Sequence, residues 1–205
     1  MTGVDALVER LRDVDTTSLS DADKRLRVLP PTIRPVVTGR RMVGRAVTAE
    51  ANEDLRSVLA GLEQSGRGDV LVVAGCGDVY AVAGELFATE AIRRGLAGIV
   101  IDGLCRDTAT LARLAIPVYA RGRTPRAAPA QAVPVVQVQV VVGGVEVRPG
   151  DLLVGDDDGI IVGTEAELAA AIGAAEEIQT REASLRTSIE RGSSLFDLVS
   201  FGQQS

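Results

Sequence analysis

Short apolar runs alternate with segments of helix-forming residues between residues 41 and 121. The runs are bounded by glycine or proline and have the length of strands, while the intervening segments carry good helix formers and several end at glycine. The predicted strands cover residues 41–50, 68–74, 98–101 and 116–121, and the predicted helices cover 53–64, 84–94 and 108–114. This alternation of strands and helices is typical of an α/β fold.

The tract from Val133 to Val162 has a different pattern. Its short β-rich runs are separated by turn sequences, which are Gly143-Gly144, Pro149-Gly150 and 156–159. Such runs predict hairpins that pack as a second sheet layer. Residues 156–158 are consecutive aspartates, which favours a β-turn over a calcium loop because an EF-hand alternates its ligands.

Helices are predicted at both ends of the chain. Val4 to Leu11 and Ser18 to Leu26 would form two short ones, the second capped by Ser18 or Ser20, before an extended, proline-containing connector at 29–35. Thr164 would cap a long last helix that ends at Gly192, with Glu167 completing a capping box.

The last helix carries an apolar stripe with one carboxylate in it. The stripe consists of Leu168, Ile172, Ala175, Ile178, Leu185 and Ile189. Glu182 falls in line with Leu168, Ala175 and Ile189 at seven-residue spacing. It is either a polar residue that sets the register of a helix interface or a functional group presented to a neighbour, and the pattern leaves both open.

Composition narrows the class of protein. A chain of 205 residues with 46% hydrophobic residues can bury a full core as one domain with a helical appendage. It has no apolar run long enough for a membrane span, and its charged N-terminus does not resemble a signal peptide, so we expect a cytoplasmic protein. A net charge of −6 and 2% aromatic residues argue against a nucleic-acid surface.

Two absences exclude several chemistries. Without histidine, the chain cannot form a Ser-His-Asp triad, a Cys-His pair or a histidine-ligated zinc site. Its one lysine, Lys24, lies among carboxylates and is a poor Schiff-base candidate, because that mechanism needs a lysine in an apolar pocket. Chemistry at a carbonyl group would therefore use a metal with carboxylates, arginine and water.

Candidate chemistry is concentrated between Gly84 and Asp107. Arg106 offers a guanidinium for a carboxylate or enolate oxygen, and Asp107 offers a carboxylate for a hard divalent cation. The backbone amides of Leu86 and Phe87, at a helix N-terminus, would add a second anion site. Together these groups suit a metal-chelated 2-keto acid, while a plain surface ion pair at a strand end explains the arginine and aspartate equally well.

Other motifs favour structural roles. Gly75 to Tyr80 lacks the third glycine of a dinucleotide-binding loop and predicts a tight turn. Cys76 and Cys105 have no histidine to activate them and are interpreted as small packing residues. The basic segment from Arg121 to Arg126 is interpreted as a solvated connector.

Taken together, an ordered set of motifs resembles the RraA-like family, which includes class II 4-hydroxy-4-methyl-2-oxoglutarate (HMG) / 4-carboxy-4-hydroxy-2-oxoadipate (CHA) aldolases and the RraA regulators of ribonuclease E. The motifs are SDA at 20–22, IRP at 33–35, VGRAVT at 43–48, GDV at 68–70, GEL at 84–86, GIVIDGxxRD at 98–107, PVYARG at 117–122 and PGDxxxGDxDG at 149–159. The resemblance implies a swivelling β/β/α sandwich over residues 1–163, with residues 164–205 as a helical extension at a subunit interface. It also implies a homotrimer, or a dimer of trimers, with active sites between subunits.

The same resemblance implies roles for residues of the site. Asp107 would anchor Mg²⁺ or Mn²⁺, and Arg106 would bind the keto oxygen and stabilise a pyruvate enolate. The segment Gly84, Leu86 and Phe87 would bind the substrate carboxylate.

Two further carboxylates would take part in catalysis. Glu85 would order water at the metal, and Glu182 would reach in from the adjacent subunit. The implied activity is retro-aldol cleavage of a 4-hydroxy-2-keto acid to pyruvate, with oxaloacetate decarboxylation as a companion reaction. Within this family the alternative is a protein-binding regulator of a ribonuclease without catalysis. The regulators are expected to be shorter and to lack the last helix, so that helix favours the enzyme.

Overall fold

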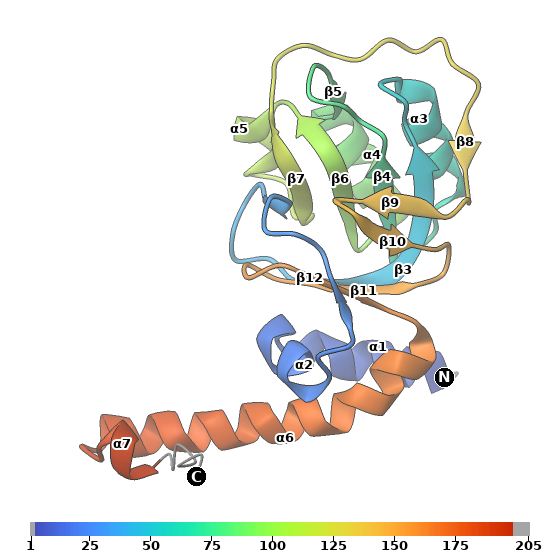
Figure 1. The fold of residues 1–205 in the computed structure, drawn as a ribbon. Helices are drawn as coiled ribbons and strands as arrows, with labels where there is room; N and C mark the ends of the chain where they lie inside the picture. Colours follow the sequence, from blue (N-terminus) through green and yellow to red (C-terminus); the bar gives the residue numbers. More distant parts are fainter. Residues whose placement is uncertain (1–2, 199–205) are drawn as a thin grey trace.

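A curled sheet of ten strands forms the centre of the fold (Figure 1). In this computed structural model, which describes residues 3–198, the strands are β1 (Arg27–Val28), β2 (Arg34–Pro35), β3 (Met42–Glu50), β4 (Asp69–Ala74), β5 (Ala81–Ala83), β6 (Gly98–Cys105), β7 (Val118–Arg123), β8 (Val135–Val136), β11 (Leu152–Gly155) and β12 (Ile160–Gly163). Their order is β1-β12-β11-β3-β4-β6-β7-β2, with β5 beside β6 and β8 beside β3. Strands β3, β4, β6 and β7 are parallel, so the loops that follow them meet at one edge of the sheet.

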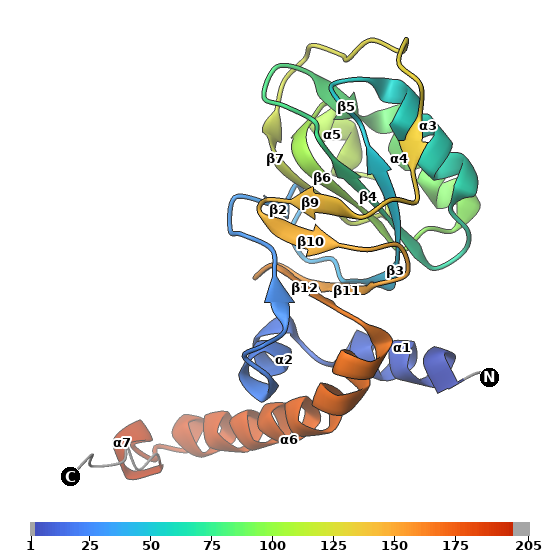
Figure 2. The same cartoon turned by 45° about the vertical axis from the view of Figure 1, so that its right-hand side comes forward.

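Different layers cover the two faces of the parallel strands. Helices α3 (Leu55–Gln64), α4 (Glu85–Arg94) and α5 (Thr108–Leu111) cover one face, where Val58 and Ala91 pack with Ile99. The hairpin of β9 (Val140–Val142) and β10 (Val145–Val147) covers the other (Figure 2). The buried strand residues alternate between these layers because neighbouring side chains on a strand point to opposite faces.

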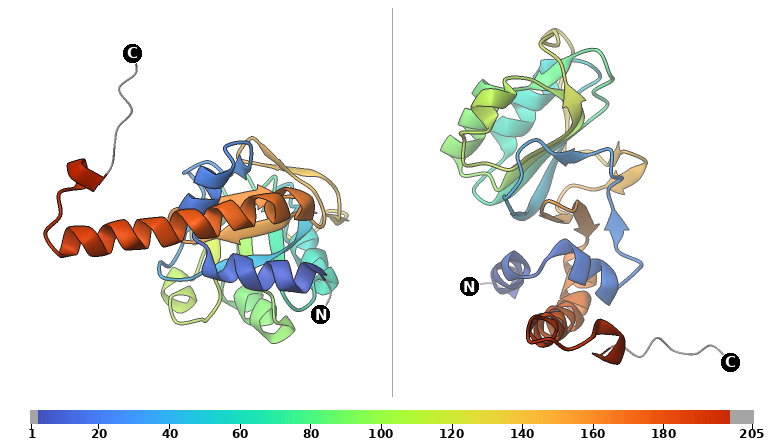
Figure 3. Two further views of the ribbon diagram at one scale, coloured as in Figure 1. Left: turned by 90° about the horizontal axis from the view of Figure 1, so that it is seen from below. Right: turned by 90° about the vertical axis from the view of Figure 1, so that its left-hand side faces the viewer.

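The terminal helices pack on the β11–β12 hairpin. These are α1 (Gly3–Asp13), α2 (Thr16–Ala22) and α6 (Glu165–Glu190), and α6 is followed by α7 (Leu195–Leu198). Leu152 and Ile161 face these helices, whereas Leu153 faces the β9–β10 hairpin. The buried residues of α6 lie between Leu168 and Ala175, and the rest of the helix runs beyond the core (Figure 3).

The predicted fold class is confirmed: a mixed α/β fold with a curled sheet and a C-terminal helix. Thr164 caps α6 in the predicted capping box with Glu167. The prediction for the hairpins is partly wrong, because β11–β12 joins the main sheet and only β9–β10 forms a separate layer.

Two predicted boundaries are also wrong. Helix α2 begins at Thr16 and is capped by Asp15, whose carboxylate accepts from the Ser18 amide at 2.7 Å, and not by Ser18 or Ser20. Strand β6 continues past Ile101 to Cys105 because β5 and β7 supply neighbours for its second half.

Part of the predicted helical extension, residues 199–205, lies outside the described residues. Between residues 3 and 198, no helix combines the length and the apolar character needed to cross a lipid bilayer.

Candidate active site

Helix α4 begins beside the loop that follows β6. The Glu85 amide donates a hydrogen bond to Asp107 Oδ2 at 3.1 Å, and the Arg106 amide donates to the Ala83 carbonyl at 3.0 Å. These bonds join the helix N-terminus to the Arg106-Asp107 pair. Gly84 permits the contact, since a Cβ at this position would lie 2.5 Å from Asp107 Oδ2. The structure therefore brings together the candidate residues from 84 to 87 and the pair at 106 and 107.

The first turn of α4 presents open amides at this point. The Ala88 amide bonds to the Gly84 carbonyl at 3.0 Å, so the amides before it have no intrahelical acceptor. Asp107 accepts from one of them, Glu85. The amides of Leu86 and Phe87 remain available at the positive end of the helix dipole, which favours a bound anion such as a carboxylate.

Asp107 has an unusual backbone conformation. Its φ of 57° and ψ of 34° are left-handed, which is uncommon for a residue other than glycine, although asparagine and aspartate adopt it more often than the others. Its carbonyl accepts from the amides of Thr110 and Leu111 in α5, and these bonds hold it in place. Arg106 Nε lies 3.5 Å from Asp107 Oδ2, with the side chains 39% and 37% exposed. This long, solvated ion pair leaves both groups accessible to a ligand.

A hollow of about 450 Å³ opens beside this pair. Besides Arg106 and Asp107, its lining includes Thr108, Thr110 and Arg123. Sequence reasoning missed Arg123, which belongs to the basic segment that was interpreted as a connector. The only signal in the sequence was its position at the end of a strand parallel to the one before Arg106.

The catalytic roles expected of Glu85 and Glu182 stay predictions. The Glu85 side chain is exposed, and the backbone amide of the same residue donates to Asp107. Glu182 lies on the exposed second half of α6. Within one chain Glu182 belongs to the helical layer below the sheet, and the Arg106-Asp107 loop lies at the edge of the sheet (Figure 1). A contribution of Glu182 to the site would have to come from another subunit.

The two cysteines and the lysine are not placed for reactions of their own. Burial raises the pKa of the Cys76 thiol to about 12, with a smaller effect from Asp102, and burial also raises the pKa of Cys105. Both cysteines are buried and unpaired with each other, consistent with packing roles. Lys24 is 73% exposed and forms an ion pair with Asp21 at 2.5 Å, so it has no apolar pocket for a Schiff base.

Comparison with known proteins gives one family match. The model of the RraA-like family, described as Aldolase/RraA, matches residues 16–162. A protein of Halalkalibacterium halodurans named "Putative 4-hydroxy-4-methyl-2-oxoglutarate aldolase" is 37% identical over 157 residues, which is 76% of this chain and 75% of that protein.

Two solved structures carry a different kind of name. "RNA-processing inhibitor RraA" from Thermus thermophilis is 36% identical with a TM-score of 0.69, covering 74% of this chain and 93% of its own. Streptomyces coelicolor RraAS2, described as an unusual member of the RNase ES inhibitor RraA protein family, is 28% identical with a TM-score of 0.76. That structure covers 88% of this chain and 96% of its own.

Proposed function

The chain belongs to the RraA-like family, and on this premise we propose that it is a lyase, a divalent-metal-dependent aldolase that cleaves a 4-hydroxy-2-keto acid to pyruvate. One observation carries the proposal. The hydrogen bond from the Glu85 amide to Asp107 sets an open helix N-terminus against a carboxylate and a guanidinium. An anion site, a cation ligand and a donor for an enolate oxygen are the groups that a 2-keto acid requires. The aldolase name of the Halalkalibacterium halodurans relative supports the same reaction class.

The donor groups fit Mg²⁺ or Mn²⁺. Mg²⁺ keeps several waters in proteins and binds through one or two carboxylates. Asp107 would hold the ion: Oδ2 accepts from the Glu85 amide, and Oδ1 accepts no hydrogen bond within residues 3–198. No cluster of three acidic or cysteine ligands occurs in that range, so the donors do not suit a cage made of protein alone. When bound, the cation supplies Lewis-acid polarisation of the keto group.

The residues of the chain would then act in sequence. The amides of Leu86 and Phe87 bind the substrate carboxylate, and Arg106 holds the keto oxygen. A water positioned by Glu85 takes the proton of the 4-hydroxyl group as the C3–C4 bond breaks. The electron pair of that bond becomes the C2–C3 double bond of the enolate, the charge moves to the keto oxygen, and the carbonyl product leaves. Arg106 stabilises this pyruvate enolate until the same water returns the proton to C3 and pyruvate departs.

Oxaloacetate should be a companion substrate. Loss of carbon dioxide from oxaloacetate gives the same pyruvate enolate, so the groups that stabilise one reaction stabilise the other. No proton has to be removed from a hydroxyl group in this case. Oxaloacetate therefore tests the enolate site separately from the base.

The proposed assembly is a homotrimer or a dimer of trimers, with Glu182 completing a neighbouring site. Apolar side chains that would be buried in such an assembly are exposed on the C-terminal part of the chain, with Ile189, Leu195 and Phe196 at 40%, 44% and 81%. Exposed apolar groups of this size commonly mark interfaces. In this arrangement Glu182 acts with Glu85 on the water that takes the proton.

The test is pyruvate release from oxaloacetate by the purified protein, with Mg²⁺, Mn²⁺ or EDTA, after subtraction of the rate of the metal alone. The decisive variant is Asp107→Asn, because asparagine tolerates the left-handed backbone and removes only the charge. We expect a loss of at least roughly 100-fold in metal-dependent release. Asp158→Asn, an exposed aspartate in the β11–β12 turn, is the matched control and should be unchanged. Wild-type release by Asp107→Asn would contradict the proposal.

The second candidate function is a protein-binding regulator of a ribonuclease, which the two RraA structures favour. The RraAS2 structure covers 88% of this chain, so the length of the chain does not separate regulator from enzyme. The preference for the enzyme therefore depends on the site and not on the last helix. Absence of turnover with either metal, together with capture of a ribonuclease by the immobilised protein, would favour the regulator.

A further inference from the structure

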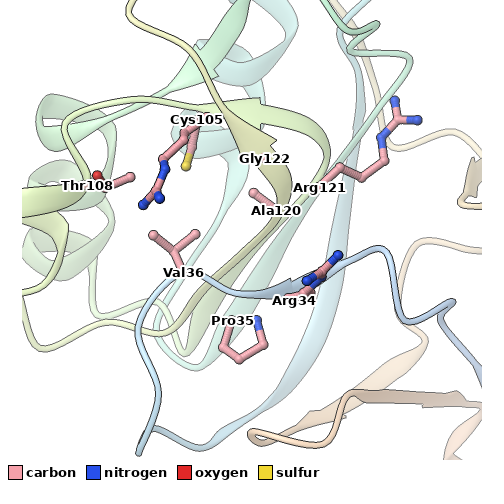
Figure 4. A pocket seen from close by; sticks show the side chains of 9 residues that line it. Arg34, Pro35, Val36, Cys105, Thr108, Ala120, Arg121 and Gly122 are labelled. Atoms are coloured by element: carbon pink, nitrogen blue, oxygen red, sulfur yellow. The ribbon is translucent and has the colours of Figure 1, made fainter.

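Helix α5 holds Asp107 in position but has little packing of its own. It has four residues, of which only Leu111 is buried. A helix this short is not stable alone in water, so α5 depends on its contacts. Its first residue, Thr108, lines the hollow of about 450 Å³ beside the candidate site. It also lines a second hollow of about 350 Å³, whose lining includes Val36 and Cys105 (Figure 4). Packing therefore secures α5 through one side chain.

Arg40 supports the end of this helix. Its Nη1 atom donates to the carbonyls of Leu111 and Ile116 at 3.2 and 2.9 Å, and its Nη2 atom donates to the carbonyl of Ala112 at 2.8 Å. The last carbonyls of a helix have no intrahelical donor, and an arginine can supply one. Because one guanidinium bonds to both ends of the turn at 112–116, it fixes where α5 lies relative to β7.

The backbone that carries Arg40 is itself fixed on both sides. The Gly39 amide donates to both carboxylate oxygens of Asp157 at 2.8 and 2.9 Å, and the Arg41 guanidinium donates to the Val14 carbonyl. Asp157 belongs to the β11–β12 turn, and Val14 lies between α1 and α2. Arg40 therefore reaches α5 from a segment that other elements hold in place.

The position of α5 determines the position of Asp107. The Asp107 carbonyl accepts from the Thr110 and Leu111 amides at 2.9 and 3.0 Å. These bonds hold the left-handed backbone of Asp107, a conformation that costs about 1 kcal/mol. In that conformation the Asp107 carboxylate accepts from the Glu85 amide at 3.1 Å. If α5 shifts, the backbone of Asp107 can relax and its carboxylate moves away from the start of α4.

We propose that Arg40 is a positioning residue of the candidate site, which holds α5 so that the Asp107 carboxylate lies against the first turn of α4. The inference rests on the proposed function for the reaction that Asp107 serves, whereas the placement of Asp107 is a property of the chain alone. Arg40 lines neither hollow, so it acts through α5 and not by touching a ligand.

Arg40→Met tests the inference, because methionine keeps an unbranched apolar stem and removes every donor. The two readouts are metal-dependent pyruvate release from oxaloacetate and NMR hydrogen exchange of the Glu85 amide in the metal-free full chain. We expect pyruvate release to fall by about 10- to 100-fold, since a reacting group is displaced. The Glu85 amide should exchange about 10-fold faster, because its bond to Asp107 opens more often. Arg40→Lys keeps a charged donor and should restore part of both.

Arg94→Met is the matched control. Arg94, at the far end of α4 from the site, also donates to carbonyls at the end of a helix, those of Glu63 and Ser65 at 3.0 and 3.3 Å. That helix is α3, which carries no candidate site residue. Arg94→Met should lower the melting temperature but leave pyruvate release and Glu85 exchange unchanged. If Arg40→Met does not fold, Arg40→Lys and Arg94→Lys carry the same comparison.

Wild-type exchange at Glu85, or wild-type pyruvate release, in Arg40→Met would overturn the inference and leave the proposed function intact. Equal losses in Arg40→Met and Arg94→Met would also overturn it, because they would show a general loss of stability. No pyruvate release by the wild type, together with faster Glu85 exchange in Arg40→Met, would remove the proposed function and leave Arg40 as the support of Asp107. If the wild type releases no pyruvate and Glu85 exchange is unchanged, both fail.

Discussion

Gly84 lies where helix α4 and the loop after β6 come closest. Its backbone is extended, with φ of −163°, so the requirement for glycine is one of space and not of backbone strain. A Cβ would meet Asp107 Oδ2 at 2.5 Å and Arg106 Cγ at 2.8 Å. A methyl group here must displace the two side chains that the proposed reaction uses.

Replacing Gly84 by alanine should therefore impair the site while the chain still folds. Displacement of reacting groups by about 1 Å can lower a rate by roughly 100-fold, and we expect Gly84→Ala to lower metal-dependent pyruvate release by about that factor. The matched control is Gly173→Ala in α6, where a Cβ meets nothing within 4 Å. That control should raise the free energy of unfolding by about 0.5–1 kcal/mol through helix propensity and leave activity unchanged. Normal activity in Gly84→Ala would show that the contact with Asp107 is not required.

At the scale of single residues, the sequence indicated which chemistry is present but not its geometry. Arg106 and Asp107 were recognisable as candidates, yet the same dipeptide suited a plain surface ion pair. The left-handed backbone of Asp107 and its bond to the Glu85 amide decide how the carboxylate is placed, and both depend on tertiary contacts. The place of Arg123 beside Arg106 and Asp107 was missed because it depends on a hollow whose lining comes from two separate strand ends.

At the scale of elements, one buried carboxylate ties helix α3 to the long loop between β7 and β8. Asp54 caps α3 by accepting from the Arg56 amide at 2.8 Å, and its other oxygen accepts from the amides of Gln131 and Ala132 at 2.6 and 3.1 Å. Burial opposes the charged form, but these three amides together outweigh it and lower the pKa of Asp54. Charge on Asp54 therefore stabilises the folded state.

Asp54→Asn should lower thermal stability in a pH-dependent way. The substitution places an amide group against backbone amides, so we expect a melting temperature several degrees below that of the wild type at pH 7. The pKa of Asp54 is lower in the folded than in the unfolded state. Its contribution to the stability of the wild type is therefore complete above the unfolded pKa of about 3.9, and it is lost as pH falls through the pKa of the folded state. The difference between the two proteins should narrow below about pH 4. A difference that stays constant from pH 7 to pH 3 would contradict this account, and Asp158→Asn should show no difference at either pH.

Elements with local signals were the most predictable from sequence. The capping box of Thr164 and Glu167 and the terminating Gly95 of α4 lie where the pattern places them, because capping depends on residues a few positions apart. The end of β6 was not predictable, since Asp102 to Cys105 become a strand through pairing with β5 and β7. The same holds for β11–β12, whose turn residues predict a hairpin but not the sheet that it joins.

At the scale of the whole molecule, the long helix α6 separates into two parts. Its first part is buried against helices α1 and α2 and the β11–β12 hairpin. Arg10 of α1 forms an ion pair with Glu176 at 2.6 Å near the end of that contact. The second part carries Glu182, Leu185 and Ile189 beyond the core (Figure 3). Apolar residues that continue the stripe past the end of its intramolecular contacts favour an interface with another subunit.

If Glu182 completes the site of an adjacent subunit, two inactive variants should restore each other. Asp107→Asn lacks the cation ligand and Glu182→Gln lacks the distant carboxylate, so each variant alone should release little pyruvate from a 4-hydroxy-2-keto acid. In mixed assemblies, a site between an Asp107-bearing subunit and a Glu182-bearing neighbour contains both native residues. Random mixing in equal amounts places both at about one quarter of the sites, whatever the number of subunits in the ring.

Activity after mixing should therefore approach about one quarter of the wild-type value once subunits have exchanged. Partial denaturation followed by reassembly lets the subunits exchange, and light scattering shows that the assembly has formed again. Glu177→Gln, an exposed glutamate on the same helix, should be active without mixing. Recovery would require the two residues to act across a subunit boundary, because no single chain in the mixture carries both. A Glu182→Gln variant that is active alone would assign Glu182 to the register of the helix interface. A mixture that forms joint assemblies but stays inactive would contradict a site shared between subunits.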